Sequence, residues 1–438
     1  MIDKTQFKDK KAVYYTLGCK LNFSETSTIG RTLQEVGFRT ARRGEQADIC
    51  VVNTCSVTEQ ADKKCRQAIH KLVKQHPDAF VVVTGCYAQL KPEQVAAIPG
   101  VDLVLGMDKK GALLDYLTSL DKREHGEMVT IPTKDIRTFV PSCSQGDRTR
   151  FFLKVQDGCD YCCAYCTIHY ARGSSRNMPI ADLVEEARQI AAGGQKEIVI
   201  TGVNTGDFGR TTGESFLDLL KALNEVEGIE RYRISSIEPN LLTDEIIAFC
   251  ASSPKFQHHF HIPLQSGSDR ILQSMGRRYT SARFADRIAK VKELMPDAFI
   301  GIDVIVGFPG EKEEHFLETY HLLEQVKPAF LHIFPFSERP GTPAVNLPEK
   351  VQSSVATERV ERLEELSRRL HGDFCRAGVG QVQEVLFEST LRGGMMTGFT
   401  GNYRRVKVPY RRQYINQIVP VRLLEMDEQH DLAGEILE

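Results

Sequence analysis

The sequence predicts an α/β protein of several domains: an N-terminal doubly wound parallel sheet, a central incomplete TIM-like barrel, and a small C-terminal β-barrel. Three observations lead to this prediction. The chain has 438 residues, which is too long for one ordinary core. Apolar runs alternate with helical patterns up to about residue 130 and again from residue 151, and the pattern turns β-rich after Cys375. We expect domains at 1–140, 141–373 and 374–438.

The first domain is predicted from apolar runs that are typical of buried parallel strands. These runs are AVYYTL (12–17), DICVVN (48–53) and AFVVVTG (79–85). Helical patterns follow the runs at about 24–36, 57–75 and 92–98. The alternation of strands and helices therefore favours an open, doubly wound sheet.

The central domain follows a polar stretch, PSCSQGDRTR (141–150), that is typical of a linker. Its candidate strands are FFLKVQ (151–156), EIVITG (197–202), RYRISSIE (231–238), HHFHI (258–262), FIGIDVIVG (299–307) and FLHIFPF (330–336). Six βα units predict an incomplete barrel, because eight units close a full one. A long charged helix (349–371) ends this region, and QVQEVLFES, MMTGFTGNYRRVKVP and INQIVPVRLLEM predict the strands of the last domain.

The composition points to a cytoplasmic protein with metal or redox chemistry. The N-terminus, MIDKTQFKDKK, has no apolar core of a signal peptide, and no apolar run is long enough for a membrane helix. Twelve cysteines in a reducing compartment argue for metal binding rather than for disulfides. The net charge of −2 gives no global argument for nucleic acid, so such a partner needs a local basic patch.

The strongest motif is a loop after the first barrel strand, where Cys159, Cys163 and Cys166 form C-x-x-x-C-x-x-C. We call these three residues the signature trio. Thiolates at this spacing can wrap one iron–sulfur cluster and leave one iron open for a small molecule. Cys162 also allows a closed four-thiolate zinc or iron–sulfur site. We favour three ligands, because the side chains of adjacent residues diverge on an extended backbone.

A second set of cysteines has no short spacing but a shared setting. Cys19, Cys55 and Cys86, which we call the strand-end trio, each lie just past the carboxyl end of a predicted parallel strand. Ligands of open α/β sheets bind outside those ends, so these thiols should converge. From the residues alone, a second three-ligand cluster and simple packing of small apolar side chains are both open. Five cysteines outside both trios are interpreted as packing or surface residues: Cys50, Cys65, Cys143, Cys250 and Cys375.

The loop GCDYCCAYC resembles the radical S-adenosylmethionine (SAM) signature, and residues 150–340 resemble the methylthiotransferases in particular. The stretches EIVITGVNTGDFG, ISSIEPN, HIPLQSGSDRILQSMGRRYT, DVIVGFPGE and FSERPGTPA carry this resemblance. TLGCKLN, NTCSVT and TGCYAQ are similar to the N-terminal domain of the same family. Cys162 stands where the family pattern has an aromatic residue.

The resemblance implies a radical SAM barrel, two [4Fe–4S] clusters held by the two trios, and SAM as methyl donor and radical source. It places Tyr165 near the adenine of SAM, and Ser236 and Glu238 near its ribose or amino group. Strand-end position adds further candidates for SAM binding: Thr201, Gly202, Asn204 and Gln265. His258, His259 and His261 lie on alternating faces of one strand, so we expect core or supporting roles rather than a shared metal.

The C-terminal domain carries a basic, aromatic-rich span with no Asp or Glu between Arg392 and Arg422. Basic side chains grip phosphates and aromatic rings stack on unpaired bases. The span resembles the TRAM domain that methylthiotransferases use for tRNA. The expected RNA-binding residues are Arg404, Arg405, Lys407, Arg411 and Arg412. The alternative is a solvated basic face.

The resemblance implies a tRNA methylthiotransferase that acts on N6-threonylcarbamoyladenosine at position 37, beside the anticodon. One SAM would methylate sulfur on the auxiliary cluster, and a second would give the radical that removes hydrogen from C2 of the adenine. The implied partners are the tRNA anticodon stem-loop, an electron donor such as flavodoxin or ferredoxin, and a sulfur donor. Rival substrates are isopentenyladenosine in tRNA and a ribosomal protein aspartate. A non-catalytic iron–sulfur or zinc RNA-binding module is disfavoured, because purely structural sites are usually closed.

Overall fold

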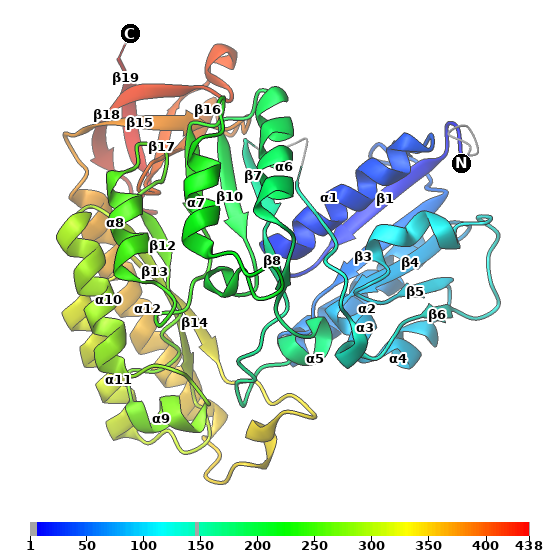
Figure 1. Ribbon diagram of the computed structural model, residues 1–438, viewed down its shortest axis with the longest axis horizontal. Helices are drawn as coiled ribbons and strands as arrows, with labels where there is room; N and C mark the ends of the chain where they lie inside the picture. Colours follow the sequence, from blue (N-terminus) through cyan, green and yellow to red (C-terminus); the bar gives the residue numbers. More distant parts are fainter. Residues whose placement is uncertain (1–6, 145–148, 438) are drawn as a thin grey trace. The chain divides into compact units, whose positions relative to one another are not determined.

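The computed structural model describes residues 7–144 and 149–437 of the chain. The centre of the predicted linker, 145–148, and the first six residues of the N-terminus therefore lie outside the described residues. The chain divides into two compact units (Figure 1). The first unit joins Met1–Gln145 with Phe152–Met178 and Ser337–Thr342, and the second unit holds the remainder.

The first unit is built on a parallel sheet with the strand order β2-β1-β3-β4-β5-β6. Its strands are β1 (Lys11–Thr16), β2 (Arg39–Thr40), β3 (Ile49–Thr54), β4 (Phe80–Gly85), β5 (Leu103–Leu105) and β6 (Glu127–Val129). Strands β3 and β4 are buried throughout, which is why their sequences are continuous apolar runs. The predicted parallel sheet is confirmed.

Helices cover both faces of this sheet, as a doubly wound fold requires. The helix α1 (Lys20–Glu35) packs with the 3₁₀ segment η1 (Lys110–Tyr116) on the face that buries Ile49 and Phe80. The helix α2 (Glu59–Gln75) covers the other face, where Cys65 and Leu72 pack against alternate residues of the same strands. The short helices α3 (Cys86–Leu90) and α4 (Pro92–Ala96) follow β4.

The second unit contains the parallel barrel strands. They are β10 (Glu197–Thr201), β11 (Arg231–Ile234), β12 (His259–His261), β13 (Phe299–Val306) and β14 (Phe330–Pro335). All ladder pairs among them are parallel, and single bridges join β11 to the segment around β12. The strand β7 (Arg150–Lys154), which begins within this unit, lies beside β10 in the sheet order. Six βα units and an open barrel agree with the sequence prediction.

Helices alternate with the barrel strands. They are α6 (Ile180–Ala192), α7 (Phe216–Asn224), α8 (Asp244–Ser252), α9 (Asp269–Ser274), α10 (Ser281–Leu294), α11 (Glu313–Val326) and α12 (Ser353–Arg376). Several begin at a side-chain cap, such as Thr280, whose hydroxyl accepts from the amide of Arg283. The long charged helix expected at 349–371 is α12, shifted toward the C-terminus by a few residues. Within the described ranges no helix is long and apolar enough to cross a membrane.

The C-terminal region forms a closed five-stranded β-barrel with the order β15-β16-β17-β19-β18. Its strands are β15 (Val382–Phe387), β16 (Met395–Thr400), β17 (Arg405–Pro409), β18 (Ile418–Met426) and β19 (Leu432–Ile436). Alternate side chains such as Val385, Phe387, Val406 and Val408 fill its interior. The predicted small β-barrel is confirmed.

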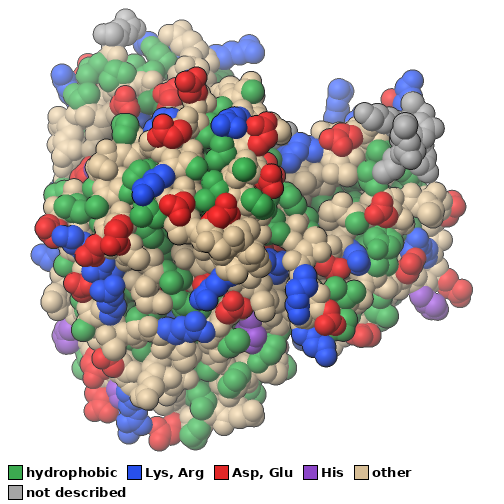
Figure 2. Space-filling view, in the orientation of Figure 1, with side chains coloured by type: hydrophobic (Ala, Val, Ile, Leu, Met, Phe, Trp, Pro, Cys, Tyr) green, Lys and Arg blue, Asp and Glu red, His purple; other side chains and the backbone are tan. Residues whose placement is uncertain are grey.

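Acidic and basic side chains intermix on the face of the molecule that Figure 2 shows.

Candidate functional site

The three cysteines of the strand-end trio follow three adjacent strands of the sheet in the first unit. Cys55 and Cys86 come directly after β3 and β4, and Cys19 lies three residues after β1. These strands are neighbours in the order β1-β3-β4 and run parallel, so their carboxyl ends share one edge. The sheet itself therefore brings the cysteine positions together.

The thiols of the trio are close neighbours. Gly18, the residue directly before Cys19, packs against Cys55: a Cβ atom added to Gly18 would lie 3.2 Å from the Sγ atom of Cys55. The pKa of the Cys55 thiol is raised to about 12, mainly by burial and in part by the neighbouring Cys86 and Cys19. Burial also raises the pKa of the Cys86 thiol, and the nearby Cys19 acts in the same direction. Three soft sulfur donors at one sheet edge are the ligand set that iron–sulfur clusters use, so these residues fit the predicted cluster.

Two glycines shape the backbone around the strand-end trio. Gly18 and Gly85 have φ angles of +111° and +104°, which favour glycine. A Cβ atom on Gly85 would lie 2.3 Å from the carbonyl oxygen of Thr54, so only glycine allows β3 and β4 to end this close together. The turn at Gly85 also starts α3 at Cys86.

The signature trio lies on the loop between β8 (Gln156–Asp157) and α5 (Ile168–Arg172), also in the first unit. Backbone hydrogen bonds fix the loop: the amide of Cys159 donates to the carbonyl of Gly173 at 3.0 Å, and that of Cys166 donates to Cys163 at 3.0 Å. The amide of Ile168 donates to the Cys166 sulfur at 3.4 Å. Thiolates held on one ordered loop fit a three-ligand cluster.

Cys162 differs from its neighbours in this loop. It is exposed and has a φ angle of +51°, whereas the adjacent Cys163 is buried. The two side chains therefore occupy different environments. The backbone at Cys162 is left-handed and not extended as the sequence argument assumed, so the choice of three ligands stays a prediction.

Direct contacts join the two trios within the first unit. The hydroxyl of Thr167, the residue after Cys166, donates to the carbonyl of Ser56, the residue after Cys55, at 3.0 Å. The helices α3 and α5, which follow Cys86 and Cys166, pack against each other. Arg339 adds a support beside Cys55, donating to Ser56 Oγ at 2.8 Å and to Asp62 Oδ2 at 2.7 Å. The two cysteine sets therefore belong to one compact region.

Cys65 has a supporting place that the sequence did not indicate. Its buried sulfur accepts from the amide of Cys55 at 3.4 Å and donates to the same residue's carbonyl at 3.3 Å. Cys50 and Cys65 belong to the core of the first unit. The other cysteines interpreted as packing residues, Cys143, Cys250 and Cys375, are also buried.

The residues expected to bind SAM, apart from Tyr165 of the first unit, lie past the ends of barrel strands in the second unit. Thr201 is the last residue of β10 and Gly202 and Asn204 follow it, Ser236 and Glu238 follow β11, and Gln265 follows β12. Glu238 pairs with Arg277, and burial raises the pKa of its carboxyl. Glu238 is thus an ion-paired residue with restricted exposure, and its role toward SAM stays a prediction.

The three histidines around β12 separate into different environments. His258 pairs with Asp297 at 2.7 Å near the surface, and His259 stacks on Phe299 with ring centroids 5.2 Å apart. His261 points to a different partner, with its Nε2 atom 2.7 Å from Asp303 Oδ1. The three side chains therefore have three different partners.

His261 on β12 instead lies near a residue of the adjacent β13 and a residue of β14, the next strand along the sheet. One side-chain atom each of His261, Asp303 and His332 lies within 4.8 Å of the others, a spacing that could hold a cation. His261 and Asp303 already satisfy each other by a hydrogen bond. The hydrogen-bonded pair of His261 and Asp303, with the exposed His332 beside it, accounts for this grouping without an ion.

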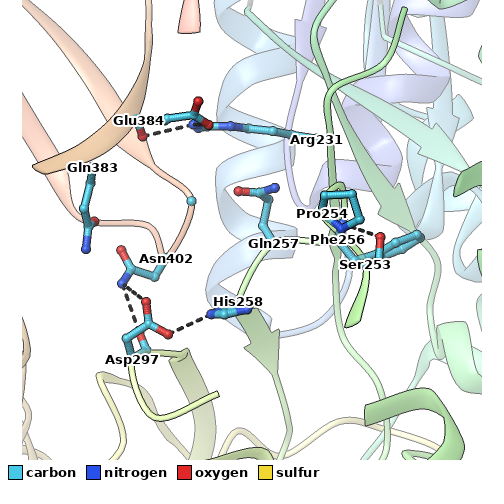
Figure 3. A pocket seen from close by; sticks show the side chains of 11 residues that line it. Arg231, Ser253, Pro254, Phe256, Gln257, His258, Asp297, Gln383, Glu384 and Asn402 are labelled. Atoms are coloured by element: carbon cyan, nitrogen blue, oxygen red, sulfur yellow. Dashed lines mark hydrogen bonds and ion pairs between the residues drawn. The ribbon is translucent and has the colours of Figure 1, made fainter. Parts of the chain in front are cut away.

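A pocket of about 320 Å³ lies between the barrel strands and the C-terminal β-barrel, within the second unit (Figure 3). Its polar groups are largely bonded to one another. Asn402 donates to Asp297 Oδ2 at 3.0 Å, and Arg231 donates to the carbonyl of Glu384 at 2.9 Å. These contacts tie the two parts together, so the pocket is interpreted as a junction.

The five basic residues expected to bind RNA fall into three groups. Arg404 is a correction: it is only 2% exposed, and its guanidinium donates to the carbonyl of Phe374 at 3.0 Å. Arg405 and Lys407 pair with Asp431, and Lys407 also pairs with Asp427. Arg411 and Arg412 are exposed at the turn before β18.

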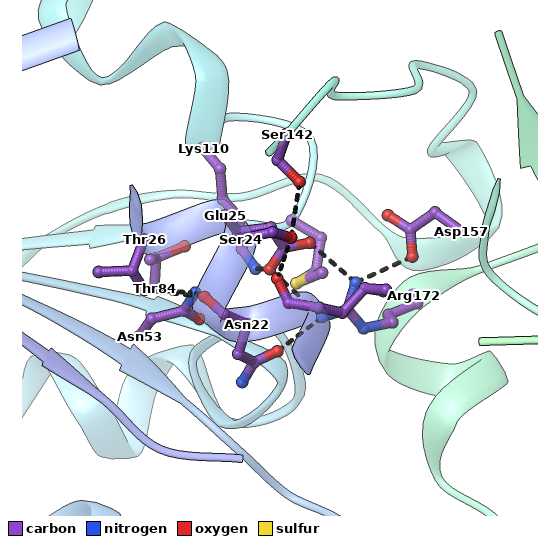
Figure 4. A network of polar contacts seen from close by, with 12 residues as sticks. Asn22, Ser24, Glu25, Thr26, Asn53, Thr84, Lys110, Ser142, Asp157 and Arg172 are labelled. Carbon is purple, nitrogen blue, oxygen red and sulfur yellow. Dashed lines mark hydrogen bonds and ion pairs between the residues drawn. The ribbon is translucent and has the colours of Figure 1, made fainter. Parts of the chain in front are cut away.

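A buried set of charges beside the strand-end trio was missed by sequence reasoning. Arg172 ends α5, and its guanidinium donates to Glu25 and Asp157 at 2.9 Å and to Asn22 at 2.7 Å. Figure 4 shows these side chains converging from α1 and from the segment around the signature trio. Asn22 and Glu25 lie one helical turn apart on α1. The buried face of α1 also contains Asn22, Ser24 and Thr26, so the sequence shows no clear apolar stripe against which Glu25 would stand out.

Family models match both parts of the chain that carry the cysteines. Residues 11–106 match Uncharacterized protein family UPF0004, and residues 153–323 match the Radical SAM superfamily. Together these matches cover more than half of the chain and include all six cysteines of the two trios.

Curated relatives match nearly the full length. The chain is 40% identical over 422 residues to "Threonylcarbamoyladenosine tRNA methylthiotransferase MtaB" of Bacillus subtilis, covering 94% of this chain and 93% of that protein. It is 36% identical to the protein of the same name from Thermotoga maritima, with 94% of each chain covered. It is also 36% identical to "tRNA-2-methylthio-N(6)-dimethylallyladenosine synthase" of Bifidobacterium adolescentis, covering 86% and 81%.

Solved structures share the fold. The radical SAM methyltransferase TsrM from Kitasatospora setae matches with a TM-score of 0.57 at 14% identity, covering 98% of this chain and 85% of TsrM. At this identity the match concerns the fold alone.

Proposed function

The chain belongs to the radical SAM methylthiotransferase family, and we propose that it converts N6-threonylcarbamoyladenosine beside the anticodon of tRNA to its 2-methylthio derivative. The main support is similarity over nearly the whole chain to proteins named for this reaction, at 40% and 36% identity. Membership of the Radical SAM superfamily implies SAM and one [4Fe–4S] cluster, which the signature trio would hold.

A second [4Fe–4S] cluster on the strand-end trio is part of the proposal. It is supported by the convergence of Cys19, Cys55 and Cys86 at one sheet edge and by their membership in the same compact unit as the signature trio. When bound, the two clusters and SAM supply the electron, the carbon radical, the methyl group and the sulfur. The residues of the chain hold these groups, order the two cysteine loops and keep the strand-end trio partly buried.

Radical chemistry is what the proposed substrate demands. The C2–H bond of adenine carries no acidic proton, so acid–base residues alone could not replace that hydrogen by sulfur. The base lies in a single-stranded loop of tRNA, which lowers the cost of extruding it. Exposed Arg411 and Arg412 on the C-terminal barrel are the residues we assign to phosphate contact. An electron donor such as flavodoxin or ferredoxin and a separate sulfur donor complete the proposed cytoplasmic system.

Nucleoside mass spectrometry of tRNA from a deletion strain tests the substrate. We expect loss of methylthiolated threonylcarbamoyladenosine, accumulation of the unmodified parent nucleoside, and restoration by the wild-type gene but not by Cys159→Ala. Unchanged levels of the methylthiolated nucleoside in the deletion strain would contradict the proposal.

A second candidate substrate is isopentenyladenosine in tRNA. It is favoured by relatives named tRNA-2-methylthio-N(6)-dimethylallyladenosine synthase, at 36% and 32% identity. The same nucleoside measurement separates the two candidates, because each predicts loss of a different methylthiolated nucleoside. Unchanged methylthiolation of both nucleosides would direct attention to the ribosomal protein aspartate.

A further inference from the structure

Six charged side chains form a buried network beside the strand-end trio in the first unit. Two are carboxylates, Glu25 and Asp157, and they are shared among four cations. The cations are Lys110, Lys154, Arg172 and Arg176. Each of the six side chains is at most 4% exposed. Figure 4 labels four of the six and shows Glu25 and Arg172 between Lys110 and Asp157.

The network does not balance its own charge. Four cations against two carboxylates leave a formal surplus of two positive charges away from water, and burial at this place lowers the pKa of Lys110. Removing a charge from water costs several kcal/mol unless an opposite charge lies nearby. Such a surplus therefore indicates an anionic group at the same place, which the carboxylates of the network do not provide.

The strand-end trio lies next to this surplus. The sulfurs of Cys86 and Cys19 are close enough that their thiolate charges favour the charged form of Arg172, after Glu25 and Asp157. The Cys19 sulfur lies 3.8 Å from Asn22 Oδ1, and the same oxygen accepts a hydrogen bond from Arg172 at 2.7 Å. The positive network and the cysteines thus face each other at short range.

Arg172 also links the two cysteine sets mechanically. It ends α5, which begins two residues after Cys166, and its guanidinium donates to Asn22 Oδ1 at 2.7 Å. The side-chain amide nitrogen of Asn22, Nδ2, in turn donates to the backbone carbonyls of Leu17 at 2.7 Å and Thr54 at 3.0 Å. Those two carbonyls immediately precede the segments that carry Cys19 and Cys55.

We propose that this buried cationic network is the built-in counter-charge of the cluster on the strand-end trio, and that Arg172 is its central positioning residue. The proposal rests on the second cluster of the proposed function. Three thiolates give a [4Fe–4S] cluster a net negative charge, and one-electron reduction makes that charge more negative. Positive surroundings stabilise the reduced form and raise the reduction potential. Arg172 therefore favours reduction of this cluster while it fixes the loops around it.

The test isolates the strand-end cluster. In a background variant with Cys159→Ala, Cys163→Ala and Cys166→Ala, only the strand-end trio remains to bind iron. A redox titration with dithionite and mediators, with electron paramagnetic resonance recorded at each potential, gives the midpoint potential of the remaining cluster. Arg172→Met and Arg172→Gln remove the charge, and Arg172→Lys keeps it. Arg233→Met is the matched control, since Arg233 is also buried and paired with a carboxylate, Glu197, in the second unit.

We expect Arg172→Met and Arg172→Gln to make reduction at least tenfold less favourable, a midpoint about 59 mV more negative for one electron. Arg172→Lys should keep most of the wild-type value, and Arg233→Met should leave it unchanged. If Met and Gln prevent the cluster from assembling while circular dichroism shows a folded chain, restoration of iron binding by Lys supports the proposal equally.

Two results would overturn the proposal. One is a wild-type midpoint in both neutral variants with full iron content. The other is identical behaviour of the Lys, Met and Gln variants, because charge would then not be the property that matters. Failure of the second cluster itself looks different: the background variant with Arg172 intact would bind no iron instead of about four atoms per chain.

Discussion

The two cysteine trios reach similar ligand sets by opposite routes. The signature trio spans eight residues of one loop, whereas the strand-end trio is drawn from three separate strands between residues 19 and 86. Local backbone hydrogen bonds fix the first, such as that from Cys159 to Gly173 at 3.0 Å. The second depends on the whole parallel sheet, because its cysteines meet only when β1, β3 and β4 end at one edge.

This difference teaches where each site is vulnerable. A local loop fails when its own turns are disturbed, while a dispersed site fails when distant strands shift. Each trio nevertheless lies in the same compact unit and touches the other through Thr167 and Ser56. Variants can therefore be chosen that damage one trio, the other, or the link between them.

The largest effects should come from removing each trio separately. Changing Cys159, Cys163 and Cys166 to Ala should abolish SAM cleavage and methylthiolation, because the radical source is lost. Changing Cys19, Cys55 and Cys86 to Ala should also abolish methylthiolation but retain cleavage of SAM to 5′-deoxyadenosine. Each triple variant should bind about four irons per chain, half of the wild-type content.

Product analysis by mass spectrometry and iron determination after anaerobic reconstitution measure these outcomes. Cys250→Ala, a buried cysteine outside both trios, is the control and should keep the full iron content. Retention of eight irons after removal of the strand-end trio would refute the comparison between the two sites.

Substitution of a glycine beside each trio should have a smaller effect that is selective for that trio. Gly85→Ala should place a Cβ atom 2.3 Å from Thr54 O and distort the strand-end trio, lowering stability by roughly 1–3 kcal/mol. Gly158→Ala, whose Cβ would lie 2.0 Å from Ser174 O, should distort the signature loop instead. Each should reduce iron binding at its own trio, measured in the background that retains only that trio.

The control for both is Gly44→Ala in the same unit. Gly44 has a φ angle of +89° but nothing within 4 Å of an added Cβ, so it reports backbone strain without a clash. Thermal denaturation gives the loss of stability. Equal iron loss at both trios in Gly85→Ala would mean that the two sites do not fail independently.

The two trios also differ in how far the sequence alone could predict them. The signature trio was evident because its ligands are neighbours in the chain, and β3 and β4 were evident as continuous apolar runs. The residues alone left the strand-end trio open, since its thiols meet only through tertiary structure. The resemblance to a family, rather than spacing, favoured a cluster there.

Charges were the least predictable feature. Lys154 and Asp157 lie at the end of a strand pattern, where a charge normally indicates exposure, yet both are buried with Glu25. Arg404 was expected at an RNA surface, but Phe374 on α12 covers it. Lys407 was expected to bind RNA, yet the fold of the barrel places Asp427 and Asp431 against it. In each case the burial or pairing of the charged side chain is set by residues that are distant along the chain.

A third prediction concerns a region that should leave both trios intact. Arg411→Ala with Arg412→Ala should weaken binding of an anticodon stem-loop about tenfold and lower the slope of log K against log salt by about 1.5, as expected for two lost phosphate contacts. Lys407→Ala is the control: its ammonium is held by Asp427 at 2.8 Å and Asp431 at 2.7 Å, so we expect a smaller effect. Fluorescence anisotropy at several salt concentrations measures both. A larger loss for Lys407→Ala would reverse the assignment.

The smallest expected effect tests the link between the trios. Thr167→Val removes the hydroxyl that donates to the Ser56 carbonyl at 3.0 Å and leaves that buried oxygen without its partner, which should lower the free energy of unfolding by about 1–2 kcal/mol. Thr357→Val, which removes an exposed hydroxyl bonded within α12, should change it by less than about 0.5 kcal/mol. Urea denaturation of the cluster-free protein measures both changes. If the contact couples the sites, Thr167→Val should also slow cluster assembly at both trios, whereas slower assembly at the signature trio alone would show that each loop holds its cluster without help from the other.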